Sequence, residues 1–323
     1  MCNSLVLLQN INEPTFMDYV EEIIKLKKEK NAVILAHYYQ YPEIQDIADY
    51  VGDSLGLSKQ AAATNADMIV FAGVHFMAET AKIINPTKTV VLPDLEAGCS
   101  LSESCPASSL QKFKDEHPDH AVVSYINCSA EVKAISDIIC TSSNAVKVVE
   151  SIPLNKNIIF APDKNLGRFV SEKTGRKMLV WDGECEVHVE FSNEKIERIK
   201  DANPDAKLIA HPESQQHILD KSEFIGSTSA LLQFVQEDNS TKFIVATEVG
   251  ILHKMKQLAP DKKFIPAPIS ADNSCACSEC PYMKLNTLEK IYSCMKSGIP
   301  EIKVEESIRV AASRALDKML AIS

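Results

Sequence analysis

The sequence of 323 residues lacks the features that point to a membrane or to a nucleic acid. Its longest apolar stretch, near Met68 to Ala78, is interrupted by His75. That stretch is shorter than the roughly 20 apolar residues that a membrane-spanning helix needs. Basic residues number 34 against 44 acidic ones, and the formal net charge of -10 argues against binding to a phosphate backbone. An apolar content of 45% with 24% charged residues, and no low-complexity tract, indicates an ordinary globular protein.

The beginning of the chain also lacks a basic segment ahead of its brief Leu-Val-Leu-Leu run, so it does not resemble a secretory signal. We therefore expect a cytoplasmic protein. In a chain of this length without an export signal, ten cysteines indicate metal binding or catalysis more than disulfides. Four of these cysteines carry no further signal and are expected to be buried packing residues, namely Cys2, Cys128, Cys140 and Cys294.

The chain contains an internal repeat with three copies. Each copy opens with a charged helical stretch followed by a strand-like apolar run; the helical stretches are Met17 to Lys30, Ser108 to His120 and Ser192 to Asp205, and the runs are Asn31 to Tyr39, Ala121 to Asn127 and Ala206 to Glu213. Three further segments recur in each copy, and we call them the second, third and fourth stations of the repeat. The second station carries hydroxyl side chains, and the third begins at FAGVHF, FAPDKN and VATEVG. The fourth station ends at Cys99, Cys185 or Cys280. Such self-similarity predicts three α/β units, at residues 1–106, 107–191 and 192–323.

The runs are rich in Val, Ile, Ala and Leu, which is typical of strands buried on both faces of a parallel sheet. Strands that alternate with amphipathic helices indicate βαβ crossovers. Ligands collect beyond the carboxyl ends of such strands, so three sheets pointing at a common centre would build one pocket. The third unit also carries an amphipathic helix, Glu305 to Leu320, which we expect to buttress another unit.

Three thiolates that converge from separate units can hold a zinc ion or an iron-sulfur cluster. Structural zinc sites usually have four ligands in short local pairs, and Cys99 and Cys185 have no such partner. A cluster of four irons held by three cysteines keeps one iron open, which can polarise a substrate oxygen. Cys280 is the expected third ligand, while Cys275 and Cys277 beside it could form a redox pair or a local metal site. A dehydratase of small hydroxy acids and a zinc-stabilised scaffold or redox sensor remain alternatives.

Polar residues stand at matching places at the ends of the three opening runs, as candidate acids, bases and binding groups: His37 and Tyr39, Tyr125 and Asn127, His211 and Glu213. The hydroxyls of the second station are expected to begin helices, as N-caps or as parts of an anion site: Ser54, Ser142, Ser227 and Thr228.

The motifs of this sequence, in their order, resemble those of quinolinate synthases over nearly the whole chain: AHYYQYPEIQDIADYVGDS, AGCSLSESCP, SYINCSAEVKA, APDKNLGR, WDGECEVH, HPES, GSTS, IVATE and CPYMKLN. The resemblance implies an iron-sulfur enzyme of NAD biosynthesis that condenses iminoaspartate (iminosuccinate) with dihydroxyacetone phosphate to quinolinate, with loss of phosphate and water. It implies a pseudo-threefold arrangement of α/β/α sandwiches with small parallel sheets around a central active site. It also implies functional coupling to an aspartate-oxidising enzyme.

Carried over by motif, the resemblance places a 4Fe-4S cluster on Cys99, Cys185 and Cys280. It places iminosuccinate contacts on His37, Ser54, Tyr125, Ile126, Asn127, Ser142, His211, Pro212, Glu213 and Thr228. Tyr39 and Glu213 match positions of proton transfer. The sequence departs from the family at Cys-x-Cys-x-x-Cys, where many bacterial members have Cys-x-x-Cys-x-x-Cys, so a thiol switch there is in doubt.

Overall fold

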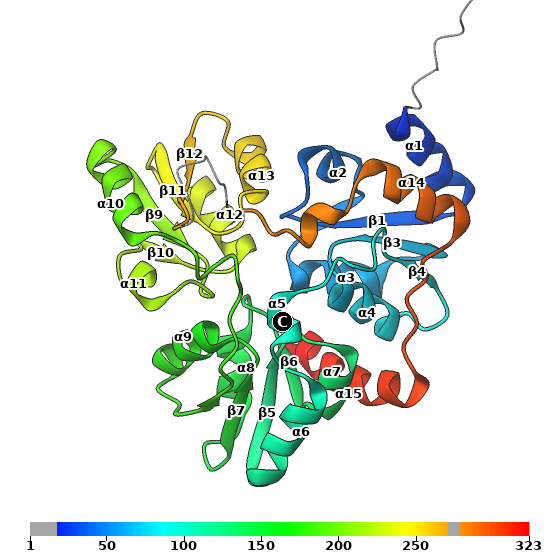
Figure 1. The fold of residues 1–323 in the computed structure, drawn as a ribbon, viewed down its shortest axis with the longest axis horizontal. Coiled ribbons are helices and arrows are strands. Elements are labelled where there is room, and N and C mark those ends of the chain that lie inside the picture. Colours follow the sequence, from blue (N-terminus) through cyan, green and yellow to red (C-terminus); the bar gives the residue numbers. More distant parts are fainter. Residues whose placement is uncertain (1–17, 271–277, 323) are drawn as a thin grey trace, which may run out of the picture.

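The fold of the chain consists of three small parallel sheets with helices packed around them, seen in a computed structural model that describes residues 18–270 and 278–322 (Figure 1). Each sheet has four strands in the same order, second-first-third-fourth: β2-β1-β3-β4, β6-β5-β7-β8 and β10-β9-β11-β12. All strand pairs within these sheets are parallel. The predicted α/β fold with three repeated units is confirmed, while the limits of the units stay a prediction.

The strands of the first sheet are β1 (Ala32–His37), β2 (Tyr50–Gly52), β3 (Met68–Ala72) and β4 (Thr89–Val91). Those of the second are β5 (His120–Tyr125), β6 (Ile138–Cys140), β7 (Asn157–Ala161) and β8 (Leu179–Val180). Those of the third are β9 (Lys207–Ala210), β10 (Phe224–Ile225), β11 (Lys242–Ala246) and β12 (Lys263–Pro266). The central strands β1, β3 and β11 are buried along nearly their whole length, because helices cover both faces of each sheet.

The helices of the first repeat are α1 (Tyr19–Glu29), α2 (Pro42–Ile47), α3 (Ser54–Ala63), α4 (His75–Ile84) and α5 (Ser100–Glu103). The second repeat contains α6 (Ala107–Glu116), α7 (Ala130–Ile135), α8 (Ala145–Ser151) and α9 (Lys164–Thr174). The third contains α10 (Asn193–Ala202), α11 (Gln216–Leu219), α12 (Thr228–Glu237) and α13 (Ile251–Leu258), followed by the 3-10 helix η1 (Met283–Leu285), α14 (Leu288–Ser297) and α15 (Glu306–Ile322). The three charged stretches of the repeat are therefore α1, α6 and α10, each shorter than expected by a few terminal residues.

The hydroxyls expected to begin helices do so in two of the three repeats. Ser54 is the first residue of α3, but Asp53 before it is the N-cap. Ser227 is the N-cap of α12, and its side chain accepts a hydrogen bond from the amide of Ala230. The expectation is wrong for Ser142, because α8 begins three residues later and Asn144 is its N-cap. The Asn144 side chain instead closes the turn by accepting the N–H of Thr141.

The last two helices tie the C-terminal part of the chain back onto the first two repeats. Helix α14 packs against α1, and α15 packs against α7, β6 and α4 (Figure 1). Helix α15 is the amphipathic segment found in the sequence, and Ala312, Ala315, Leu316 and Met319 form its buried face. Its contacts with two different repeats agree with a buttressing role. None of the described helices is both long and apolar enough to cross a membrane.

Leu316→Ala is expected to lower the free energy of unfolding by about 2–5 kcal/mol, because the side chain is fully buried and its removal leaves a cavity. Chemical denaturation of the metal-free chain measures this loss. The matched control is Asp317→Ala on the exposed side of the same helix, which should stay within about 0.5 kcal/mol of the parent. Equal effects of the two substitutions would show that α15 does not contribute through its packed face.

Candidate functional site

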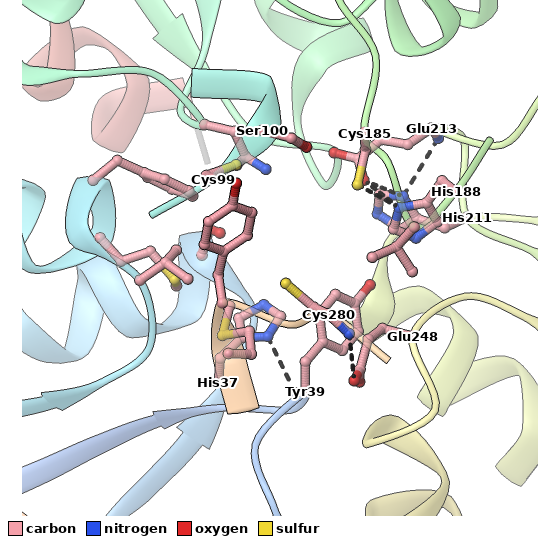
Figure 2. A pocket seen from close by; sticks show the side chains of 18 of the residues that line it. His37, Tyr39, Cys99, Ser100, Cys185, His188, His211, Glu213, Glu248 and Cys280 are labelled. Carbon is pink, nitrogen blue, oxygen red and sulfur yellow. Dashed lines mark hydrogen bonds and ion pairs between the residues drawn. The ribbon is translucent and has the colours of Figure 1, made fainter. Parts of the chain in front are cut away.

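A pocket lies where the three repeats meet, and residues from all three line it (Figure 2). The pocket encloses about 710 Å³ of space not filled by protein atoms, part of it open to solvent. This size suits small molecules. Many lining side chains lie at the ends of parallel strands or just after them: His37 and Tyr39 at the end of β1, Tyr125 and Asn127 at the end of β5, and His211 and Glu213 after β9. These are the strand-end pairs that the repeat pointed to.

The three cysteines that end the repeats all line this pocket (Figure 2). Each lies beyond the fourth strand of its sheet: Cys99 after β4, Cys185 after β8 and Cys280 after β12. Burial raises the pKa of Cys99 to about 12, that of Cys280 to about 11 and that of Cys185 well above its usual value. The Cys185 pKa is also raised by the other two thiols, which shows that the three sulfur atoms share one region.

Such a set of thiols is suited to a cationic metal centre. Without a cation, burial and mutual repulsion keep the three thiols protonated, whereas a bound metal ion deprotonates a coordinating thiol outright. The remaining described cysteines, Cys105, Cys128, Cys140 and Cys294, are buried among apolar side chains. This was the expectation for Cys128, Cys140 and Cys294. Cys2, Cys275 and Cys277 lie outside the described residues.

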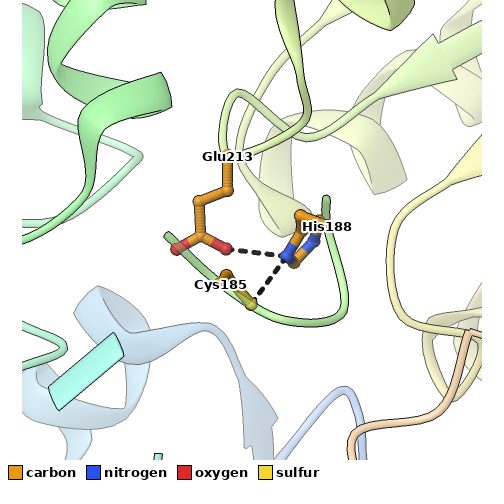
Figure 3. Close-up of side chains that lie close together, drawn as sticks. All are labelled: Cys185, His188 and Glu213. Atoms are coloured by element: carbon orange, nitrogen blue, oxygen red, sulfur yellow. Dashed lines mark hydrogen bonds and ion pairs between the residues drawn. The ribbon is translucent and has the colours of Figure 1, made fainter. Parts of the chain in front are cut away.

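A second group of potential metal ligands overlaps the first, and consists of Cys185, His188 and Glu213 (Figure 3). Their ligand atoms lie within 4.8 Å of one another. His188 Nδ1 is 2.9 Å from a Glu213 carboxylate oxygen and 3.2 Å from the Cys185 sulfur. The same three residues therefore offer a nitrogen, an oxygen and a sulfur, which is a donor set that zinc also accepts.

His188 connects Glu213 to Tyr39 through Thr247. The Nε2 atom of His188 is 3.0 Å from the Thr247 hydroxyl, and that hydroxyl is 2.7 Å from the Tyr39 hydroxyl. Burial raises the pKa of Tyr39 well above its usual value, so the phenol stays protonated. Burial opposes ionisation of Glu213, but His188 and His211, with a hydrogen bond from Tyr125, together outweigh it and hold the pKa of that carboxyl low. The pocket thus contains a proton donor and a proton acceptor joined by two hydrogen-bonding side chains.

Several other side chains that line the pocket are neutral hydrogen-bonding groups. Burial lowers the pKa of His37 to about 4 and that of His211 to about 3, so both imidazoles are neutral near pH 7. His211 Nε2 lies 3.2 Å from the Ser142 hydroxyl. Ser54 and Thr228 stand at the first turns of α3 and α12, where free backbone amides favour anions. These groups can bind carboxylate or phosphate oxygens.

Three polar atoms in the pocket point to a ligand, because they are buried and lack a hydrogen-bond partner among the described residues. They are Asn127 Oδ1, Glu186 Oε1 and Glu213 Oε1. A buried polar atom without a partner is destabilising by about 1–3 kcal/mol, so it usually marks a ligand or water site. Asn127 and Glu213 were singled out in the sequence, whereas Glu186 was not.

Twelve of the fourteen residues singled out as ligands or substrate contacts line the pocket: His37, Tyr39, Ser54, Cys99, Tyr125, Asn127, Ser142, Cys185, His211, Glu213, Thr228 and Cys280. Ile126 and Pro212 are buried beside it and do not contribute lining side chains. The sequence argument missed Asp53, Thr141, His188 and Glu248, which also line the pocket, and Thr247 behind it. The third station, VATEVG, was the available signal for Thr247 and Glu248.

Asp53 connects the first turn of α3 in the first repeat to the loop before α8 in the second repeat. One carboxylate oxygen accepts the N–H of Gly56 at the start of α3, and the other accepts the hydroxyl of Ser143 at 2.7 Å. Ser143 is the neighbour of Ser142 in the second repeat. Asp53 therefore fixes Ser54 and Ser142 relative to each other.

Comparisons with known proteins show similarity to one family over most of the chain. The NadA family model, described as "Quinolinate synthetase A protein", matches residues 21–321. A quinolinate synthase of Trichormus variabilis is 62% identical over 307 residues, which cover 95% of this chain and 94% of the relative. Quinolinate synthases of a Synechococcus species and of Thermosynechococcus vestitus are 60% and 59% identical, over 306 and 310 residues; these cover 95% and 96% of this chain, and 95% and 97% of the relatives.

Proposed function

The chain belongs to the quinolinate synthase family, and from this premise we propose that it condenses iminoaspartate (iminosuccinate) with dihydroxyacetone phosphate to quinolinate, releasing phosphate and water. It is an enzyme of NAD biosynthesis. The observation that carries the proposed reaction is the convergence of three thiols with a buried carboxylate and a buried phenol in one pocket.

Cys99, Cys185 and Cys280 are the residues that would hold a 4Fe-4S cluster. Their donor set fits such a group, because the thiols come from three repeats and all line the pocket. When bound through three cysteines, a 4Fe-4S cluster supplies one open iron that can polarise a substrate oxygen as a Lewis acid. The alternative donor set of Cys185, His188 and Glu213 would give a zinc site instead, and metal analysis distinguishes the two.

Neutral hydrogen-bond donors would bind the anionic groups of the two substrates. His37, Ser54, Ser142 and Thr228 offer imidazole and hydroxyl groups, and the first turns of α3 and α12 add backbone amides. Asn127 and His211 complete this part of the pocket. Ile126 and Pro212 belong to the two proposed contact segments, residues 125–127 and 211–213, and are buried there beside the pocket.

Tyr39 and Glu213 are suited to the proton transfers. The Tyr39 phenol stays protonated and can give a proton, while the ionised Glu213 can accept one. Thr247 and His188 link the two residues by hydrogen bonds of 2.7 and 3.0 Å and the 2.9 Å contact with Glu213. A proton taken up at Glu213 can therefore be returned through His188 toward Tyr39.

The chemistry of the substrate defines the partner enzyme. Iminoaspartate carries an imine at the carbon that bears the amine in aspartate, so it must be supplied by an enzyme that oxidises aspartate. We therefore propose functional coupling of this chain to an aspartate-oxidising enzyme.

Anaerobic purification followed by metal analysis and a product assay tests this function. The protein should be brown, contain about four iron and four acid-labile sulfide per chain, and form quinolinate from the two substrates, detected by chromatography. A colourless, zinc-containing protein would favour the scaffold alternative. Iron-sulfur protein that dehydrates a small hydroxy acid but forms no quinolinate would favour the dehydratase alternative.

A further inference from the structure

A buried ion pair lies at the edge of the pocket, between Glu248 and Lys284. Glu248 has no exposed surface and Lys284 is nearly buried, and the Lys284 ammonium is 2.9 Å from Glu248 Oε1 (Figure 2 shows Glu248). The desolvation of two buried charges can exceed their mutual attraction, so such a pair is weak evidence for a stabilising role. The role of the pair is therefore indicated by the backbone groups that its two side chains contact.

Glu248 holds the backbone at Cys280. Its Oε1 atom accepts the N–H of Cys280 at 3.3 Å, and its Oε2 atom accepts the N–H of Gly250 at 2.6 Å. Two further hydrogen bonds join the same segments, from the Ser278 hydroxyl to the Thr247 carbonyl at 2.9 Å and from the Val249 amide to the Ser278 carbonyl at 3.0 Å. The turn after β11 thus fixes the position of the Cys280 segment.

Lys284 holds the backbone at Tyr39. Its ammonium donates to the Tyr39 carbonyl at 2.6 Å and lies 4.9 Å from the centre of the Tyr41 ring. Tyr39 belongs to the first repeat, Glu248 to the third, and Lys284 follows Cys280 in the chain. One ion pair therefore joins three segments that are distant in sequence.

The backbone of the Tyr39 loop packs directly against the turn that carries Glu248. A Cβ atom on Gly250 would lie 2.7 and 2.8 Å from backbone atoms of Tyr39, so the two backbones are in direct contact. Gln45 also joins the two segments, since its amide nitrogen is within 3.0 Å of the carbonyls of Tyr38, Gln40 and Gly250. The Tyr39 hydroxyl also contacts Thr247 in the same turn.

The two charges also compensate each other next to Cys280. Glu248 accepts the Cys280 amide, which places a carboxylate close to a residue expected to carry a thiolate. Lys284 neutralises that carboxylate. Without the lysine, the negative charge of an ionised Glu248 would be uncompensated beside Cys280, which opposes a thiolate there.

We propose that Glu248 and Lys284 are positioning residues that fix the Tyr39 hydroxyl relative to the Cys280 sulfur, so that the proton donor and the metal-binding side of the pocket keep one spacing. The inference rests on the proposed function, in which Cys280 is a metal ligand. Neither side chain has to contact the reacting atoms for this role. Their effect passes through the Cys280 amide and the Tyr39 carbonyl.

The test compares Lys284→Met with the double variant Glu248→Gln/Lys284→Met in the anaerobically loaded enzyme. Lys284→Met should speed iron release to a chelator at least ~10-fold, which is the size of effect seen for residues that orient metal ligands. It should also lower kcat at least ~10-fold per iron-loaded chain, while KM stays within about threefold of the parent value. In the double variant no buried charge of this pair is left. The amide oxygen introduced at position 248 can still accept the Cys280 N–H, while the amide nitrogen cannot accept the Gly250 N–H that Glu248 Oε2 accepts. Iron retention and the melting temperature of the metal-free protein should return toward the parent, whereas kcat stays low because the Tyr39 carbonyl has lost its ammonium donor.

Lys290→Met is the matched control, because Lys290 also contacts a carboxylate and a backbone carbonyl, those of Asp94 and Leu285, without lining the pocket. It should leave iron release and kcat at parent values. Recovery of kcat together with stability in the double variant would overturn the inference, since the pair would then be structural only. So would a Lys284→Met variant that matches the control; if that variant does not fold, the double variant decides. A parent chain without iron and without quinolinate formation would instead overturn the proposed function, and this inference with it.

Discussion

Cys185→Ala is expected to abolish quinolinate formation and to reduce bound iron to less than about one-tenth of the parent value. The reason is that Cys185 is one of three thiols that line the pocket in the described part of the chain, and a metal centre cannot be held by the other two at comparable affinity. Iron and sulfide analysis after anaerobic reconstitution measures the loss. The metal-free variant should keep the circular-dichroism spectrum of the metal-free parent, because Cys185 is partly exposed and lies in the loop between β8 and α10, outside the helices and strands.

Cys294→Ala is the control for this prediction. Cys294 is as completely buried as a core residue, but it lies in α14 among the apolar side chains that pack against α1, and it does not line the pocket. This variant should bind iron as the parent does and lose only a small part of its stability. Parent-like iron in Cys185→Ala, or iron loss of equal size in both variants, would refute the assignment of Cys185 as a ligand.

Tyr39→Phe is expected to lower kcat by about 10²–10⁴-fold while iron content stays at the parent value. The substitution removes only the hydroxyl that contacts Thr247, and a positioned acid or base contributes about this factor to a rate. The ring remains to pack against His37, whose ring centre is 4.4 Å away. Steady-state kinetics of the iron-loaded variant gives the result.

Tyr38→Phe is the matched control, since Tyr38 is the adjacent residue and does not line the pocket. Its hydroxyl lies beside Ser229, so its removal should change kcat by less than about threefold. If Tyr39→Phe also retains kcat within that range, Tyr39 is not the proton donor. A loss of iron in Tyr39→Phe would assign it a structural role at the metal centre instead.

Much of the fold could be predicted because its signals are local. Each opening strand is a short run of Val, Ile, Ala and Leu, and each is preceded by a charged amphipathic helix, so the three repeats are visible in the sequence. The cysteines recur at the same place in every copy, and the structure places all three beyond the fourth strand of a sheet. The repetition identified these three cysteines as candidate ligands. A single cysteine could not have been identified in this way, because an isolated cysteine is most often a packing residue.

The errors and omissions concern side chains whose partners come from another repeat. Ser142 was expected to begin a helix, but the Asn144 side chain closes a turn there, and the Ser142 hydroxyl contacts His211 of the third repeat. Thr247 and His188 were not assigned roles, since nothing near them in sequence shows that they connect Tyr39 to Glu213. A neutral threonine gains its importance only from the two residues placed on either side of it.

The sequence by itself determined the α/β class, the threefold repetition, and which thiols and strand-end residues are candidates, because hydrophobic pattern and residue spacing act over a few neighbouring residues. Only the tertiary structure decided that these candidates share one pocket and that Glu248 and Lys284 join Cys280 to Tyr39. It also decided the ionisation of the site, with Glu213 charged and Tyr39 and His211 neutral. The physical reason is that burial and charge depend on what packs around a group, and these neighbours come from distant parts of the chain.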